Sequence, residues 1–112
     1  MPLAKRWSPF TLVNLRLVPR EAGVYELGDV KGEIVYIGSS DSGENVRGRL
    51  AAHKRSKKAF VVKRFRYQVC GMWDWEGARS LEERHCNIFK SQHDGKLPRL
   101  QKAMPHSYWP DF

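Results

Sequence analysis

Cysteine is scarce in this sequence of 112 residues, which contains only Cys70 and Cys86. Two cysteines cannot make a disulfide framework, and cytosolic thiols are normally kept reduced, so we interpret both as core thiols. The sequence also has no run of about 18 apolar residues, which excludes a membrane-spanning helix. Its first residues lack the apolar stretch of a secretory signal. We therefore expect a cytoplasmic protein with no membrane partner, associated with the nucleoid if its source is bacterial.

Acidic residues are missing from a long central stretch, because none lies between Glu44 and Asp74. Nine of the 20 Lys and Arg residues fall there, and the net charge of the chain is +8. An acid-free cluster suits counterion release from a phosphate backbone, although a charge run can also be an ordinary solvated face. We predict a DNA partner, with RNA as an open alternative. The residues assigned to backbone contact are Arg47, Lys54, Arg55, Lys57, Lys58, Lys63, Arg64 and Arg66.

The length corresponds to one domain, since globular domains most often have about 100–150 residues. The apolar fraction of 41% is sufficient for one core without disulfide or metal staples. We divide the chain into an N-terminal arm, residues 1–20, that packs on the domain, and the domain itself, residues 21–112. Within the arm, a strand or turn is expected over 10–17.

The periodicity of the domain predicts an α/β (α+β) fold, with a small three-stranded antiparallel sheet flanked by helices. The segments GVYELG and EIVYIG, joined by turn residues, predict a hairpin. One helix is expected from about Glu44 and a second over 78–92, which Gly95 ends. Between the helices, alternation predicts a third strand with Phe65, Tyr67 and Val69 on its buried face and Arg64, Arg66 and Gln68 on its polar face.

Several short motifs occur in a fixed order along these elements. The tripeptide GVY, 23–25, is followed after ten residues by YIG, 36–38. Arg49 precedes His53 by one helical turn, so both side chains point to the same side of the first helix. The second helix contains the segment ARSLE, 78–82.

These motifs, in this order, resemble the GIY-YIG nuclease family over residues 22–101, with Pro98 near the family's closing segment. The ordered set coincides with the predicted elements, which strengthens the resemblance. It implies a single-domain endonuclease that hydrolyses DNA with Mg²⁺ (or Mn²⁺) as cofactor. Such a chain is expected to select a structure or strand rather than a sequence, with a partner protein or a homodimer supplying further specificity.

The resemblance implies catalytic roles for Tyr25, Tyr36, Arg49, His53 and Glu82. Tyr25 is the candidate base for the attacking water, and a cation such as Arg49 would favour its phenolate. Tyr36 would orient water or phosphate, and the guanidinium of Arg49 matches two phosphate oxygens. His53 would accept the tyrosine proton or contact phosphate. Glu82 would be the lone protein ligand of the metal, which suits Mg²⁺ because that ion keeps most of its waters.

Some alternatives stay open. Glu83 competes with Glu82 for the metal, although helical phase favours Glu82. Gln101 stands near Pro98, where the family has an asparagine, and is expected to give structural support. Taken singly, strand tyrosines and helix carboxylates are ordinary packing and surface groups. Two other functions therefore compete with the nuclease: a weak or inactive nucleic-acid-binding module with the same fold, and a small protein whose basic face binds an acidic partner.

Overall fold

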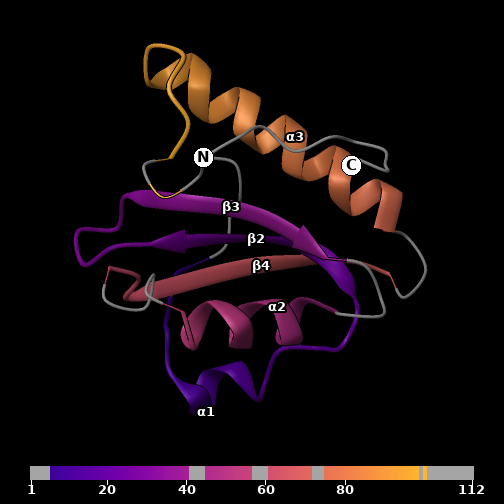
Figure 1. Ribbon diagram of the computed structural model, residues 1–112. Helices are drawn as coiled ribbons and strands as arrows, with labels where there is room; N and C mark the ends of the chain where they lie inside the picture. Colours follow the sequence, from indigo (N-terminus) through magenta and orange to yellow (C-terminus); the bar gives the residue numbers. More distant parts are fainter. Residues whose placement is uncertain (1–5, 41–44, 57–60, 72–74, 99, 101–112) are drawn as a thin grey trace.

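The computed structural model describes residues 6–40, 45–56, 61–71, 75–98 and 100. Figure 1 shows three layers, with an antiparallel sheet between α3, Trp75–Gln92, on one face and α2, Asn45–Lys54, on the other. The short helix α1, Leu12–Leu15, lies beside α2. The sheet has four strands in the order β1-β4-β2-β3, with β1 at Ser8–Pro9, β2 at Ala22–Gly28, β3 at Ile34–Ser40 and β4 at Arg64–Gly71.

The predicted hairpin is confirmed by the pairing of β2 with β3. Its turn is organised by Asp29, whose Oδ1 accepts hydrogen bonds from the backbone N–H groups of Lys31 and Glu33 at 2.9 and 3.0 Å. Aspartate favours such turns because its short side chain can bond the backbone a few residues ahead. The hairpin register sets Tyr25 directly opposite Gly38.

The arm differs from the prediction. Instead of a strand or turn over 10–17, it forms β1 and then α1, which begins after Thr11; the Thr11 side chain accepts a hydrogen bond from the Asn14 N–H at 3.3 Å. Within the described residues the sheet consequently has four strands rather than three, because Ser8 and Pro9 pair with the start of β4. A two-residue strand is too short to show alternation, so its sequence carries no strand signal.

Both long helices agree with their predicted positions, although α3 begins three residues before Ala78. At the start of α2, Asn45 has a φ of 57° and its Oδ1 accepts from the Gly48 N–H at 2.8 Å, which satisfies one of the first N–H groups of the helix. After α3, Gly95 has a φ of 79° and donates its N–H to the Lys90 carbonyl at 2.8 Å. The predicted helix stop at Gly95 is therefore confirmed.

The core has two layers, one on each face of the sheet. On the α2 face, Leu27, Val46, Leu50 and Phe65 belong to one buried cluster. On the α3 face, a second cluster contains Val24, Ile37, Cys86 and Phe89. The prediction of a core thiol is confirmed for Cys86, whereas Cys70 is half-buried on β4.

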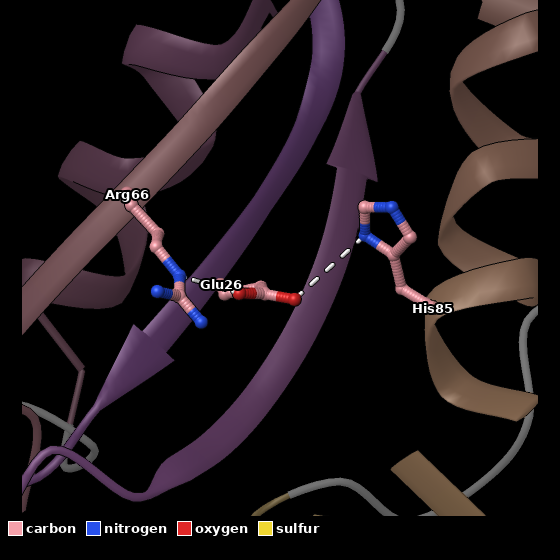
Figure 2. Close-up of polar contacts among 3 residues, drawn as sticks. All are labelled: Glu26, Arg66 and His85. Carbon is pink, nitrogen blue, oxygen red and sulfur yellow. Dashed lines mark hydrogen bonds and ion pairs between the residues drawn. The ribbon is translucent and has the colours of Figure 1, made fainter. Parts of the chain in front are cut away.

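A charged network is buried between the sheet and α3 (Figure 2). Glu26 on β2 is fully buried, and Arg66, its register partner on β4, donates from Nε to Glu26 Oε1 at 2.7 Å. The second oxygen, Oε2, lies 3.8 Å from Nδ1 of His85 on α3. Burial raises the pKa of Glu26, and Arg66 opposes this shift. Burial, with the charges of Arg84 and Arg66, lowers the pKa of His85 to about 4, so its ring is neutral at pH 7.

This network corrects two expectations about β4. The face expected to carry Arg64, Arg66 and Gln68 is exposed at Gln68, but α3 and Trp7 cover it at Arg66, which is only 3% exposed. Arg66 was also expected to contact nucleic acid, whereas its guanidinium pairs with Glu26 inside the domain. Alternation in one strand cannot reveal that a helix covers its polar side, because the pattern reports period and not what packs on it.

The lowered pKa of His85 predicts acid lability. Between about pH 6.5 and pH 4 the unfolded chain takes up a proton at this histidine and the folded chain does not, so stability falls as pH falls through this window. Replacing His85→Asn should remove that contribution. We expect the urea midpoint of the wild type to drop more between pH 7 and pH 4.5 than that of the variant.

The matched control is His93→Asn, which replaces an exposed histidine just beyond the end of α3. It should keep the acid sensitivity of the wild type. Equal losses in the wild type and in His85→Asn would contradict a buried, neutral His85.

Candidate functional site

Tyr25 occupies an unusual position for a residue of a central strand. Its side chain lies on the α2 face and crosses the neighbouring strand at Gly38, where a Cβ atom would overlap the Tyr25 Cζ and hydroxyl oxygen. Gly38 therefore lacks a side chain because the phenol ring fills that space. The tyrosine is 0% exposed, yet its hydroxyl reaches over the edge strand β3.

Two further rings surround this hydroxyl. The Tyr25 hydroxyl and Nε2 of His53, from α2, share a hydrogen bond of 2.7 Å, and His53 is 5% exposed. Tyr36 of β3 stacks on Tyr25, with ring centroids 6.3 Å apart and planes 12° apart. The Tyr36 and His53 centroids are 4.7 Å apart. Because Tyr36 is only half-buried, it forms the outer side of this group of rings.

Arg49 lies one turn before His53 on α2 and is half-buried. Burial raises the pKa of Tyr25 well above its ordinary value, and the neighbouring Tyr36 adds to the shift, while the charge and a hydrogen bond of Arg49 oppose it. The cationic field expected from Arg49 is thus present, but burial outweighs it. The pKa of Tyr36 is raised as well, chiefly by burial and then by the charge of Glu82. Both phenols are therefore protonated at neutral pH.

Glu82 approaches from α3 on the other side of the sheet and is 8% exposed. Its Oε1 accepts a hydrogen bond from the Ser39 hydroxyl on β3. Burial raises the pKa of Glu82 to about 7, against the opposing effects of Ser39, Arg79 and Arg49. The charge of Glu82 also raises the pKa of both tyrosines, so Glu82 lies near the four predicted residues on the other face of the sheet; we call these five residues the β3-edge site.

Helical phase separates the two adjacent glutamates. Glu82 is buried against Ser39, whereas Glu83 is half-buried one residue, or about 100°, further around α3. The structure thus places Glu82 against Ser39 of β3 and directs Glu83 to a different side of α3.

The predicted nucleic-acid-binding cations that the structure describes do not form one exposed face. Arg47 donates to the backbone carbonyls of Val18 and Arg16 at 2.8 and 2.7 Å, so it ties α2 to the segment after α1. Arg64 donates to the Val30 carbonyl at 2.6 Å and thereby contacts the hairpin turn.

The remaining cations of that set differ in exposure. Lys54 is half-buried, with its Nζ 5.2 Å from the centre of the Phe10 ring. Arg55 and Lys63 are exposed. Three predicted residues lie outside the described residues, namely Lys57, Lys58 and Gln101.

Sequence reasoning missed two residues that act on Glu82. Ser39 lies beyond the predicted strand segment EIVYIG, but it is the sixth residue of β3 and bonds Glu82. Arg79, whose charge lowers the pKa of Glu82, precedes it by three residues on α3. The spacing of three on a helix was available as a signal for Arg79. The strand β3 continues beyond YIG into Ser39 and Ser40, but serine favours turns, so these residues did not indicate a strand.

Comparison with known proteins gives a family but no activity. A family model described as a domain of unknown function, DUF7508, matches residues 1–87, so the chain belongs to this family. The matched region includes all five residues of the β3-edge site. No curated protein matches the chain, and no solved structure does.

The described residues offer few ligands for a metal ion. Within the described residues, no group of three or more His, Cys, Asp or Glu side chains is placed to bind a metal ion. Any cation bound at Glu82 would therefore take few ligands from this part of the chain.

No helix in the described ranges is long and apolar enough to cross a membrane.

The close approach of Tyr25 predicts the effect of a small substitution. Gly38→Ala inserts a methyl group into the space of the phenol ring, and we expect overpacking to reduce the free energy of unfolding by about 1–3 kcal/mol. Urea denaturation measures the change. The matched control is Gly48→Ala, where the new Cβ meets nothing closer than Asn45 Oδ1 at 3.5 Å.

Because alanine favours helix formation over glycine, Gly48→Ala should raise stability by up to about 1 kcal/mol. A lower free energy of unfolding for Gly38→Ala and a higher one for Gly48→Ala would support the position of the Tyr25 ring over Gly38. A neutral Gly38→Ala would show that Tyr25 does not lie across β3.

Proposed function

We propose that this protein is a metal-dependent endonuclease that hydrolyses phosphodiester bonds in nucleic acid, with DNA as the expected substrate. One observation carries the proposal: two phenols, an imidazole and a guanidinium from β2, β3 and α2 gather at one edge of the sheet, and a carboxylate from α3 lies near them on its other face. Water activation, charge stabilisation on phosphate and stabilisation of a leaving oxygen need groups of these kinds.

The β3-edge site has an outer and an inner part. Tyr36 and Arg49 are half-buried and form the outer part, which solvent reaches. There the planar guanidinium of Arg49 is suited to pair with two oxygens of the scissile phosphate, and it stays charged at any working pH. Tyr25 and His53 form the inner part, because their side chains are 0% and 5% exposed.

This layering bears on the path of the proton. Attack of water on phosphorus breaks the bond to the leaving oxygen, and the proton from the water must reach a base. In our proposal Tyr36 orients the water, and the Tyr25 hydroxyl accepts the proton while it passes its own to His53, with which it already shares a hydrogen bond. Such a transfer avoids a free phenolate, which burial of Tyr25 disfavours.

Glu82 is the residue that would hold a divalent cation. Its raised pKa means that burial penalises the carboxylate, and a cation would favour the ionised form. One carboxylate is enough for Mg²⁺ (or Mn²⁺), since Mg²⁺ keeps several waters and takes few protein ligands. When bound, the ion would supply positive charge to the phosphate and the leaving oxygen.

Cleavage of labelled flaps, junctions, nicked duplex, plain duplex and single strands tests the proposal. We expect cutting in Mg²⁺ or Mn²⁺ and none in chelator. Tyr25→Phe, Arg49→Lys and Glu82→Gln should each reduce kcat/KM by about a hundredfold or more. Tyr25→Phe removes the hydroxyl that relays the proton, Arg49→Lys keeps the charge but removes the paired donors of the guanidinium, and Glu82→Gln removes the anionic carboxylate.

Glu83→Gln is the matched control, as it removes the neighbouring carboxylate outside the site, and it should keep nearly full activity. If no substrate is cut while salt-sensitive binding persists, the protein is a nucleic-acid-binding module and the hydrolysis proposal fails.

Metal binding at Glu82 has a readout that does not depend on activity. A ligand that binds only the folded state raises the Tm. We expect millimolar Mg²⁺ at pH 8 to raise the Tm of the wild type and of Glu83→Gln, and to leave that of Glu82→Gln unchanged. Equal shifts in all three proteins would place the cation elsewhere.

A further inference from the structure

A cavity of about 620 Å³ opens between α3 and the start of β3, away from the residues of the β3-edge site. Its walls include Trp7, Arg66 and Val35 on the sheet side and Phe89, Gln92 and His93 on the helix side. This volume is within the range of small-ligand sites, roughly 300–1,000 Å³. Neither the family description nor the proposed hydrolysis assigns it a role.

Two planar groups stack on each other at the sheet side of the cavity. The Trp7 ring lies against Gly28, where a Cβ atom would come within 2.9 Å of the indole. The Arg66 guanidinium stacks on this ring, with its Cζ 4.1 Å from the ring centroid. Arg66 is 3% exposed and is held from behind by Glu26 (Figure 2), so the guanidinium has little freedom to move.

The helix side also presents flat groups. The His93 ring stacks on Phe89, with centroids 3.7 Å apart and planes 6° apart. The His93 Nδ1 and the Phe89 carbonyl share a hydrogen bond of 2.8 Å, which holds the ring in place. Planar groups on both walls favour a flat, aromatic ligand over an aliphatic one.

The charges around the cavity select against a phosphate. The positive charge of Arg66 is neutralised by Glu26, and the lining contains two carboxylates, Glu33 and Asp94, against one ammonium, Lys96. A phosphate would meet net negative charge, whereas an uncharged heterocycle would find both acceptors and donors for its edge. Carboxylates accept hydrogen bonds from exocyclic amino groups of bases, and the Gln92 amide can serve as donor or acceptor.

The cavity and the β3-edge site share two elements. Val35 lines the cavity and the next residue, Tyr36, belongs to the site. On α3, Phe89 follows Glu82 by seven residues, about 10 Å along the helix axis. A substrate strand that runs along β3 and α3 from Glu82 could therefore place a base in the cavity, and only an unpaired base could enter it.

We propose that this cavity, the Trp7 cavity, binds an unpaired nucleobase of the substrate strand and so directs the enzyme to flaps, bulges or single-stranded segments. The role in substrate choice rests on the proposed hydrolysis. Base binding itself is inferred from the residues that line the cavity, and it is measured without cleavage.

The binding test uses the four deoxynucleosides, which carry a base and no phosphate, and inorganic phosphate as a separate arm. In ¹H–¹⁵N NMR spectra of the wild-type chain, we expect nucleosides to shift the Trp7 indole N–H and the amides of Gly32 and Lys96. Inorganic phosphate should leave these signals in place. Shifts by phosphate alone would make the cavity an anion site and overturn the proposal.

The cleavage test compares two duplexes that differ by one unpaired nucleotide near the cut. The wild type should prefer the unpaired substrate at least about tenfold in kcat/KM, the size of one stacked base. Gln92→Trp, which fills the cavity from the exposed end of α3, should lose the preference but still cut paired duplex. Asn87→Trp, at another exposed position of the same helix, should keep it.

The two proposals fail in different ways. Nucleoside shifts at Trp7 without any cleavage would overturn hydrolysis and leave the base site. Cleavage without nucleoside shifts, and with equal rates on both duplexes, would overturn the base site and leave hydrolysis.

Discussion

The contact between the Tyr25 ring and the bare backbone of Gly38 is the constraint on which the rest of the β3-edge site depends. A residue in the middle of a sheet is normally separated from the edge by its neighbour's side chain. With no side chain at 38, a phenol from the central strand reaches the edge. There it meets an imidazole from one helix layer and lies near a carboxylate from the other, so the site draws on both faces of the sheet.

Burial shifts the pKa values of this site and also makes its polar groups unfavourable for stability. Polar groups taken out of water are unfavourable unless they are hydrogen-bonded or paired. The phenol of Tyr25 and the carboxylate of Glu82 both meet this condition in part, through His53 and Ser39. Their raised pKa values express what remains uncompensated, and the charge of Arg49 opposes both shifts. A cation beside Glu82 would stabilise its carboxylate, and an anionic substrate would pair with the charge of Arg49.

Local patterns in the sequence were sufficient for the hairpin, both long helices and the stop at Gly95, because strand alternation, helical spacing and turn residues act over a few positions. The ordered motifs, through the family resemblance that they carry, pointed to the five residues of the β3-edge site. They could not give the depth of Tyr25, which follows from packing by α2. Nor could they show that α3 covers β4 and buries Arg66, since the partner of a face is set by the whole chain. The strand β1 was missed because two residues are too few for any period.

The buried network at Glu26 has a consequence for how α3 is aligned. An apolar helix face repeats about every turn, so it can pack on a sheet in positions that differ by about 5.4 Å along its axis. His85 opposite Glu26 removes this ambiguity, because a shift by one turn would leave the carboxylate facing an apolar side chain. Glu82 is three residues away on the same helix, and its alignment with Ser39 is therefore set partly by a polar pair near the middle of the sheet. The longitudinal position of the helix is thus encoded in the placement of one polar side chain rather than in shape alone.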